Sequence, residues 1–222
     1  MNNIDSEILT IMMIDLVGYS SKSASINREE FTKLHDVFDN LSLTTFEKFS
    51  GKVIKKIGDA FLITFKSPTD AVHCGKELLE RFAQHNKDKN KNEHLNIRVA
   101  INSGEILHRE NDIYGDAVNV AARIEGITPA DEIYFSHSVY QTINRNEVSC
   151  LEVGYFELKN IPEPVRIFKV RNAQDEILFR NEKIKTVVVI TVCSIAVILM
   201  LYYIVTKTNF ISQVIELIRS QI

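Results

Sequence analysis

The sequence contains little Cys, Pro and Gly and no Trp. Among 222 residues there are three Cys, four Pro, eight Gly and no Trp. So little Gly and Pro excludes a collagen-like, low-complexity or linker-dominated chain. Cys74, Cys150 and Cys193 share no short spacing such as Cys-x-x-Cys. Their scatter argues against a disulfide framework and a structural zinc site, and it fits a reducing compartment.

The chain also lacks an excess of charge of either sign. Lys and Arg number 26 against 29 Asp and Glu, which gives a formal net charge of -3 and a pI near 6.1. This balance provides no general attraction to nucleic acid, so no nucleic-acid partner is predicted. Hydrophobic residues at 45% and charged residues at 25% exclude disorder as the main state. Residues 1–7 lack a basic segment followed by an apolar one, so they predict no signal peptide.

One long uncharged run lies near the C-terminal end. The mean hydropathy of -0.04, averaged over the whole chain, does not reveal it. Residues 186–206 contain no charged side chain. As a helix they would extend over about 31 Å, which matches the hydrocarbon core of a bilayer. Tyr202 and Tyr203 suit the interface at one end. The run predicts a transmembrane helix in contact with the lipid bilayer; a wholly buried core helix is the alternative.

The segments that flank this run complete the predicted organisation. Residues 173–185 read as a juxtamembrane linker, and Lys and Arg are more frequent there than beyond the run. This bias predicts a single-pass membrane protein with residues 1 to about 180 in the cytoplasm. Residues 207–222 read as a short amphipathic tail. The tail fits an interfacial helix, a partner-binding helix or a frayed end lying on the membrane.

The first 172 residues alternate strand and helix signals and predict one domain. The expected elements are a buried strand at 8–15, a helix at 27–49 with a capping box, a strand-turn-strand at 52–65, a helix at 67–85, a strand at 94–102, a helix after Gly115, and short strands at 132–135 and 164–170. The order βαββαβ predicts an α+β fold in which an antiparallel sheet carries helices on one face, as in ferredoxin-like folds.

This topology makes a prediction about two distant carboxylates. The first and third strands lie side by side and antiparallel, so Asp15, at the end of one, meets Asp59, at the start of the other. Adjacent carboxylates repel unless a cation lies between them, and hard oxygen ligands suit Mg²⁺ or Mn²⁺. Taken singly, Asp59 also fits a plain Gly-Asp hairpin turn and Asp15 a solvated strand end.

Three ordered segments carry a more specific pattern. They are DLVGYS at 15–20, KKIGDAF at 55–61 and DIYGDAVNVAAR at 112–123. These segments resemble the signature segments of the class III nucleotidyl cyclases, and LKNIPEPVRIF at 158–168 resembles the last hairpin of that family. The resemblance covers roughly residues 8 to 170. It implies a ferredoxin-like βαββαβ cyclase catalytic domain over residues 1–172.

The resemblance implies metal-binding and base-reading roles for four residues. Asp15 and Asp59 match the aspartates that hold two Mg²⁺ or Mn²⁺ ions per active site. Lys55 and Asp112 match the pair that reads the adenine edge in adenylate cyclases. An ammonium donates to adenine N1 and a carboxylate accepts from the N6 amine, so this pair favours ATP as substrate.

Two further residues match the transition-state residues of the family. Asn119 and Arg123 lie four positions apart, on one face of the expected helix. Arg123 would stabilise charge on the α-phosphoryl group, and Asn119 would orient the ribose. In this family one subunit supplies the aspartates and the other supplies the remaining residues. The resemblance therefore implies a head-to-tail homodimer with two equivalent sites.

The chain departs from the family pattern at two places. Residues 100–104 read Ala-Ile-Asn-Ser-Gly where the family often has a Gly-Ile-His-x-Gly type, which leaves the metals and base reading untouched. The basic residue that grips the triphosphate in some members is not clearly matched near Ile161. Lys159 and the backbone amides of residues 16–20 are the candidates for that task.

The resulting expectation is an adenylate cyclase that forms 3′,5′-cyclic AMP and pyrophosphate from ATP for cyclic-nucleotide signalling. A cyclase that forms cyclic GMP or a cyclic pyrimidine nucleotide is one alternative; guanylate cyclases typically carry Glu and a small polar or Cys residue where this chain has Lys55 and Asp112. A non-catalytic nucleotide-binding membrane sensor is the other. The GG[DE]EF turn of diguanylate cyclases is absent.

Overall fold

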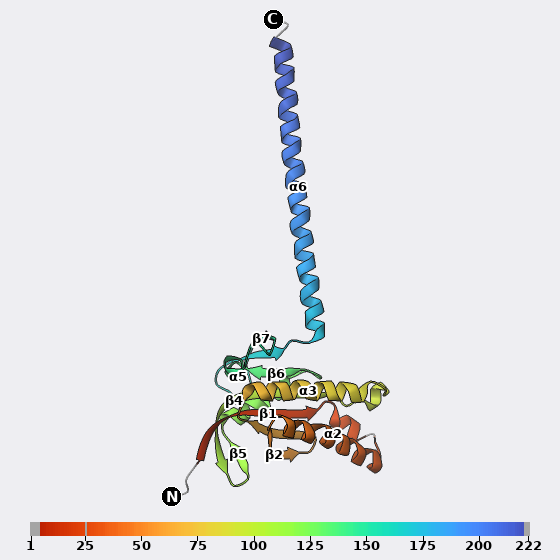
Figure 1. Ribbon diagram of the computed structural model, residues 1–222, viewed down its shortest axis with the longest axis vertical. Helices are drawn as coiled ribbons and strands as arrows, with labels where there is room; N and C mark the ends of the chain where they lie inside the picture. The colour runs from red at the N-terminus through yellow and green to blue at the C-terminus, as the bar shows by residue number, and fades with distance from the viewer. Residues whose placement is uncertain (1–4, 25, 220–222) are drawn as a thin grey trace. The chain divides into compact units, whose positions relative to one another are not determined.

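The computed structural model describes residues 5–24 and 26–219 (Figure 1). The chain divides into two compact units, Met1–Val170 and Arg171–Ile222. All the predicted site residues belong to the first unit. The second consists largely of one helix, α6 (Ala173–Arg219).

The first unit is built on one eight-stranded sheet. Its strands are β1 (Asp5–Leu16), β2 (Lys52–Ile57), β3 (Ala60–Phe65), β4 (Ile97–Arg109), β5 (Asp112–Tyr114), β6 (Ile133–Ser136), β7 (Cys150–Phe156) and β8 (Val165–Val170). The order is β2-β3-β1-β4-β6-β8-β7, and β5 pairs with β4. β1 lies between β3 and β4 and is antiparallel to both. The predicted α+β arrangement is confirmed, but the sheet is mixed and not wholly antiparallel, because β4 pairs with β6 in parallel.

Six helical segments connect these strands. They are α1 (Tyr19–Ser23), α2 (Arg28–Lys48), α3 (Pro68–Asn86), the 3₁₀ turn η1 (Lys91–Glu93), α4 (Asp116–Ile127) and α5 (His137–Thr142). The backbone N–H of Glu30 donates to Asn27 Oδ1 and that of Asn27 to Glu30 Oε2, so the predicted capping box opens α2. Gly58 has a φ of 61° in the two-residue turn between β2 and β3, a conformation that favours glycine.

The helices cover both faces of the sheet. α2 and α3 contact each other and, with α5, cover one face over a core that includes Phe38, Phe61 and Phe135 (Figure 1). α4 packs on the opposite face, where Ala117 and Ala121 join a separate core cluster. The expectation of helices on one face is therefore wrong for α4. The reason is that β1 is apolar on both sides, since neighbouring residues along it belong to the two different clusters.

The helix α6 begins inside the segment predicted to be a linker. The backbone N–H of Asp175 donates to Asn172 Oδ1 at 2.9 Å, and that of Asn172 donates to Asp175 Oδ2 at 3.0 Å. This reciprocal pair caps the first turn. Residues 173–185 are accordingly helical. For residues 208–222 the side chains lie outside the described residues, and with them the amphipathic face predicted for the tail.

The predicted transmembrane helix is not supported. Among the residues that the structure describes, no helix is both long and apolar enough to cross a membrane. The prediction rested on the absence of charge over residues 186–206, whereas a span needs about 20 consecutive residues that are predominantly apolar. Within that range several side chains, among them those at 196, 198, 201 and 202, lie outside the described residues. The predicted membrane localisation, with the catalytic domain in the cytoplasm, stays a prediction.

Candidate active site

The two predicted metal ligands meet at one end of the sheet. Asp15 is paired in register with Ala60, the residue after Asp59, and the backbone N–H of Leu16 donates to the carbonyl of Asp59 at 3.4 Å. Burial, and next the charge of Asp15, raise the pKa of Asp59 to about 6. The expectation that these carboxylates are neighbours in space is confirmed.

Two charged residues that the sequence analysis missed complete this cluster. Arg98 lies opposite Asp15 in the β1–β4 register, and its Nη2 and Nε donate to Asp15 Oδ2 at 2.5 and 3.0 Å. The same guanidinium forms an ion pair with Glu125 of α4. Burial raises the pKa of Glu125 to about 7, with Arg98 opposing the shift. The sequence could have indicated Arg98, because it is a charged residue within the alternating apolar strand at 94–102. No comparable feature of the sequence distinguishes Glu125.

The donor set at Asp15 and Asp59 fits a hard divalent cation. Two carboxylates that repel each other at a half-buried strand end attract such an ion. Within the described part of the chain, no group of three or more His, Cys, Asp and Glu side chains could hold a metal ion. The buried Glu125 Oε1 has no hydrogen bond of good geometry but lies against Arg98 Nε. The pair therefore suits Mg²⁺, which usually binds one or two carboxylates and completes its shell with water and phosphate.

The predicted base-reading residues form an ion pair. Lys55 Nζ of β2 lies 2.5 Å from Asp112 Oδ2 of β5. Their side chains are 40% and 26% exposed, so the pair is open to a ligand. The hydrogen bond from Lys55 is the main cause that holds the pKa of Asp112 below its ordinary value. The antiparallel pairing of β5 with β4 sets Asp112 opposite Arg109.

The two predicted transition-state residues are exposed on α4. Asn119 and Arg123 lie one turn apart. Arg123 Nε donates to the backbone carbonyl of Lys159 at 3.1 Å, so the Lys159 carbonyl orients the guanidinium. Asn160, at the same turn, has a φ of 61°. Lys159 thus lies beside Arg123. The contact with Arg123 is made by the backbone carbonyl of Lys159, so a contact of its ammonium with the triphosphate stays a prediction.

The six predicted residues therefore fall into three pairs. Asp15 lies with Asp59, Lys55 lies with Asp112, and the remaining two share α4. Among the described residues, no side-chain hydrogen bond joins one of these pairs to another. One chain thus presents separate parts of a site.

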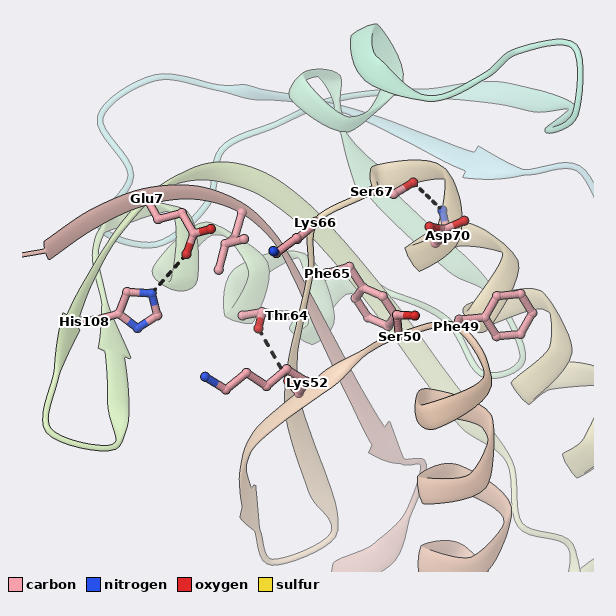
Figure 2. A pocket seen from close by; sticks show the side chains of 11 residues that line it. Glu7, Phe49, Ser50, Lys52, Thr64, Phe65, Lys66, Ser67, Asp70 and His108 are labelled. Atoms are coloured by element: carbon pink, nitrogen blue, oxygen red, sulfur yellow. Dashed lines mark hydrogen bonds and ion pairs between the residues drawn. The ribbon is translucent and has the colours of Figure 1, made fainter.

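A cavity lies away from these residues. It has a volume of about 480 Å³ and is lined by residues near the N-terminal end of β1. Figure 2 shows Lys52, Lys66 and His108 around it, with His108 Nε2 3.4 Å from Glu7 Oε2. None of the six predicted residues lines this cavity. The candidate residues lie instead at a strand end, in the partly exposed Lys55–Asp112 pair and on the exposed face of α4, an arrangement that a second subunit could complete.

Comparison with known proteins agrees with this geometry. Residues 2–172 match the family model described as the adenylate and guanylate cyclase catalytic domain. A crystal structure of an adenylate/guanylate cyclase/hydrolase from Silicibacter pomeroyi is 29% identical, with a TM-score of 0.70 over 77% of this chain and 99% of that one. The adenylyl cyclase CyaB from P. aeruginosa is 25% identical, with a TM-score of 0.69 over 77% and 97%.

Curated relatives are longer proteins. A Rhizobium meliloti protein provisionally named adenylate cyclase 3 is 30% identical over 167 residues, which are 75% of this chain and 28% of that protein. For the serine/threonine-protein kinase pkn2 of Myxococcus xanthus the identity is 28%, over 75% of this chain and 20% of the kinase. The match to the family model covers most of the chain, and the structural neighbours share its fold. The chain belongs to the class III adenylate and guanylate cyclase catalytic-domain family.

Proposed function

We propose that this chain is an adenylate cyclase that converts ATP to 3′,5′-cyclic AMP and pyrophosphate. The observation that carries the proposal is the ion pair of Lys55 and Asp112. Adenine presents an acceptor at N1 and an amine at C6, which match an ammonium and a carboxylate. Guanine presents a donor at N1 and an oxygen at C6, so the same two side chains would meet the wrong partners.

The reaction needs the ribose 3′-hydroxyl oxygen to attack the α-phosphorus while the bond to the β-phosphate oxygen breaks. The hydroxyl proton is lost and pyrophosphate leaves. Two Mg²⁺ or Mn²⁺ ions held by Asp15 and Asp59 would favour the alkoxide and neutralise the leaving group. Arg123 stabilises the charge that develops on the α-phosphoryl group, and Asn119 orients the ribose. Arg98 places guanidinium donors beside Asp15.

The active unit we propose is a head-to-tail homodimer with two sites. Cyclase domains of this family act as dimers. Within the described part of one chain, no hydrogen bond or ion pair joins the carboxylates of Asp15 and Asp59 to Asn119 or Arg123. A second copy, turned by a two-fold axis, would supply to each site what the first copy lacks.

Complementation between two inactive variants tests both the residues and the dimer. Asp59→Asn and Asn119→Ala should each lower cyclic AMP formation at least about 100-fold. In an equimolar mixture half of the dimers are mixed, and each mixed dimer holds one intact site. The mixture should therefore recover about one quarter of wild-type activity at equal total protein.

The matched control mixes two variants of the same half. Asp15→Asn mixed with Asp59→Asn leaves no dimer with an intact site, so activity should stay at the single-variant level. Recovery in this control, or none in the first mixture, would contradict the divided site.

Product analysis with ATP, GTP, CTP and UTP tests the choice of base. We expect cyclic AMP as the main product. A cyclic GMP or cyclic pyrimidine product would favour the alternative cyclases. ATP binding with no release of pyrophosphate would favour the non-catalytic sensor.

A further inference from the structure

Strand β4 makes a side-chain contact with α4 that the proposed chemistry does not explain. Asn102 Nδ2 donates to the backbone carbonyl of Ala117, in the first turn of α4, at 2.8 Å. Asn102 is only 5% exposed. Its Oδ1 in turn accepts from Ser138 Oγ of α5 at 3.1 Å. A buried amide with both ends satisfied holds its partners in one arrangement, because a buried donor or acceptor left unpaired destabilises the fold.

A glycine two positions along β4 sets how closely α4 approaches. A Cβ added at Gly104 would lie 2.9 Å from Ala117 Cβ, closer than real Cβ atoms come to a neighbour. Ala117 is buried and lies two residues before Asn119. Asn102 therefore donates a hydrogen bond to the first turn of α4, and Gly104, which has no side chain, lets the same turn pack closely against β4.

The same strand also positions the base-reading pair. β5 is antiparallel to the far end of β4, with Arg109 opposite Asp112, and Asp112 is paired with Lys55. Strand β4 therefore contacts both β5, which carries Asp112, and α4, which carries Asn119 and Arg123.

We propose that Asn102 and Gly104 are positioning residues, which fix α4 on β4 and so set Asn119 and Arg123 relative to the Lys55–Asp112 pair. The proposal rests on the adenylate cyclase function above. A displaced α4 would leave base reading intact and misalign the groups that act on the ribose and the α-phosphoryl group. A misplacement of about 1 Å can cost 100-fold in rate. The loss therefore appears in kcat and not in the KM for ATP.

A compensating pair of substitutions tests the close approach. Gly104→Ala should lower kcat at least about 10-fold and change the KM for ATP less than about three-fold. Ala117→Gly removes the Cβ that the new methyl group meets, so the double variant should return to within about three-fold of the Ala117→Gly variant. A double variant as slow as Gly104→Ala, or a Gly104→Ala variant with wild-type kcat, would overturn the proposal.

Amide hydrogen exchange over residues 116–127 gives a readout that does not depend on catalysis. Exchange should accelerate in Gly104→Ala and return toward normal in the double variant. If the wild-type chain forms no cyclic AMP while this exchange pattern holds, the proposed function fails and the role of β4 in holding α4 stands. Unchanged exchange in Gly104→Ala would overturn that role.

A second pair of variants tests the hydrogen bond. Asn102→Asp keeps the side-chain size but removes the donor to Ala117, whereas Ser138→Ala removes a donor to Asn102 and leaves the bond to α4. We expect Asn102→Asp to lower kcat about 10-fold and Ser138→Ala to change it less than two-fold, although both lower the melting temperature. Equal losses of kcat in the two variants would contradict a positioning role and indicate a general loss of stability.

Discussion

Lys55 Nζ lies 2.5 Å from Asp112 Oδ2, although 57 positions separate the two residues along the chain. The strands that carry them are not hydrogen-bonded neighbours, since β2 pairs with β3 and β5 pairs with β4. The two base-reading groups therefore neutralise each other. An exposed pair of this kind is worth about 1 kcal/mol at most, so an incoming adenine can separate it at little cost.

Removal of the Lys55 ammonium should weaken the use of ATP. In Lys55→Met the adenine N1 loses its donor and Asp112 loses its partner, so kcat/KM for ATP should fall about 100-fold. Steady-state kinetics with ATP measure this change. Lys56→Met is the matched control, because Lys56 pairs with Asp39 and not with Asp112. An equal loss in both variants would mean that charge on β2, and not base reading, is responsible.

We expect Arg98 to compete with a divalent cation for Asp15. Because its guanidinium donates to Asp15 Oδ2, Arg98→Gln removes a positive charge from the carboxylate cluster. The dissociation constant for Mn²⁺ should fall roughly five-fold, which corresponds to about 1 kcal/mol of relieved repulsion. Electron paramagnetic resonance of free Mn²⁺ at pH 8 measures it. Arg123→Gln should leave the constant unchanged, since Arg123 hydrogen-bonds to the Lys159 carbonyl. Weaker Mn²⁺ binding in Arg98→Gln would refute the competition.

The stability of the metal-free protein should fall as the pH rises from 5 to 8. The pKa of Asp59 is raised from 3.8 to about 6 and that of Glu125 from 4.5 to about 7, so the folded state binds both protons more tightly than the unfolded chain does. The stability contributed by these protons is complete below the ordinary pKa values and is lost as the pH rises through the raised ones. Urea unfolding with a chelator present, at several pH values, measures the slope.

Substitution of Asp59 separates its share of this pH dependence. Asp59→Asn should make the decline between pH 5 and 7 shallower, because one titrating group is gone. Asp88→Asn, at an exposed position in a turn, should leave the slope as it is in the wild type. A wild-type slope in Asp59→Asn would show that the decline comes from other groups.

The core on the α2 and α3 face depends on packed aromatic rings. Phe38 is fully buried, and its ring centroid lies 5.3 Å from that of Phe61 and 5.9 Å from that of Phe82. Phe38→Ala should lower the free energy of unfolding by about 3–5 kcal/mol in urea titrations. Leu43→Ala, at a 43% exposed position on the same helix, should cost less than about 1 kcal/mol. Similar costs at the two positions would contradict this account of the core.

Several local features could be predicted from the sequence because short-range interactions decide them. The capping box of Asn27 and Glu30 involves residues three positions apart, and the turn at Gly58 needs a conformation that few residues tolerate. The meeting of Asp15 and Asp59 also followed, because the order of strands and helices allows few topologies. The uncharged run at 186–206 shows the opposite case, since composition alone predicted a membrane span that the described residues do not support.

The sequence by itself determined the order of the elements, the three cyclase motifs and the six candidate residues, because each depends on residue type and short spacing. Only the tertiary structure decided that α4 covers the second face, that Arg98 joins Asp15 to Glu125, and that Lys55 already pairs with Asp112. The physical reason is that strand register and side-chain packing bring together residues from 27 to 110 positions apart. Those pairings depend on the whole sheet being formed, and no local pattern encodes them.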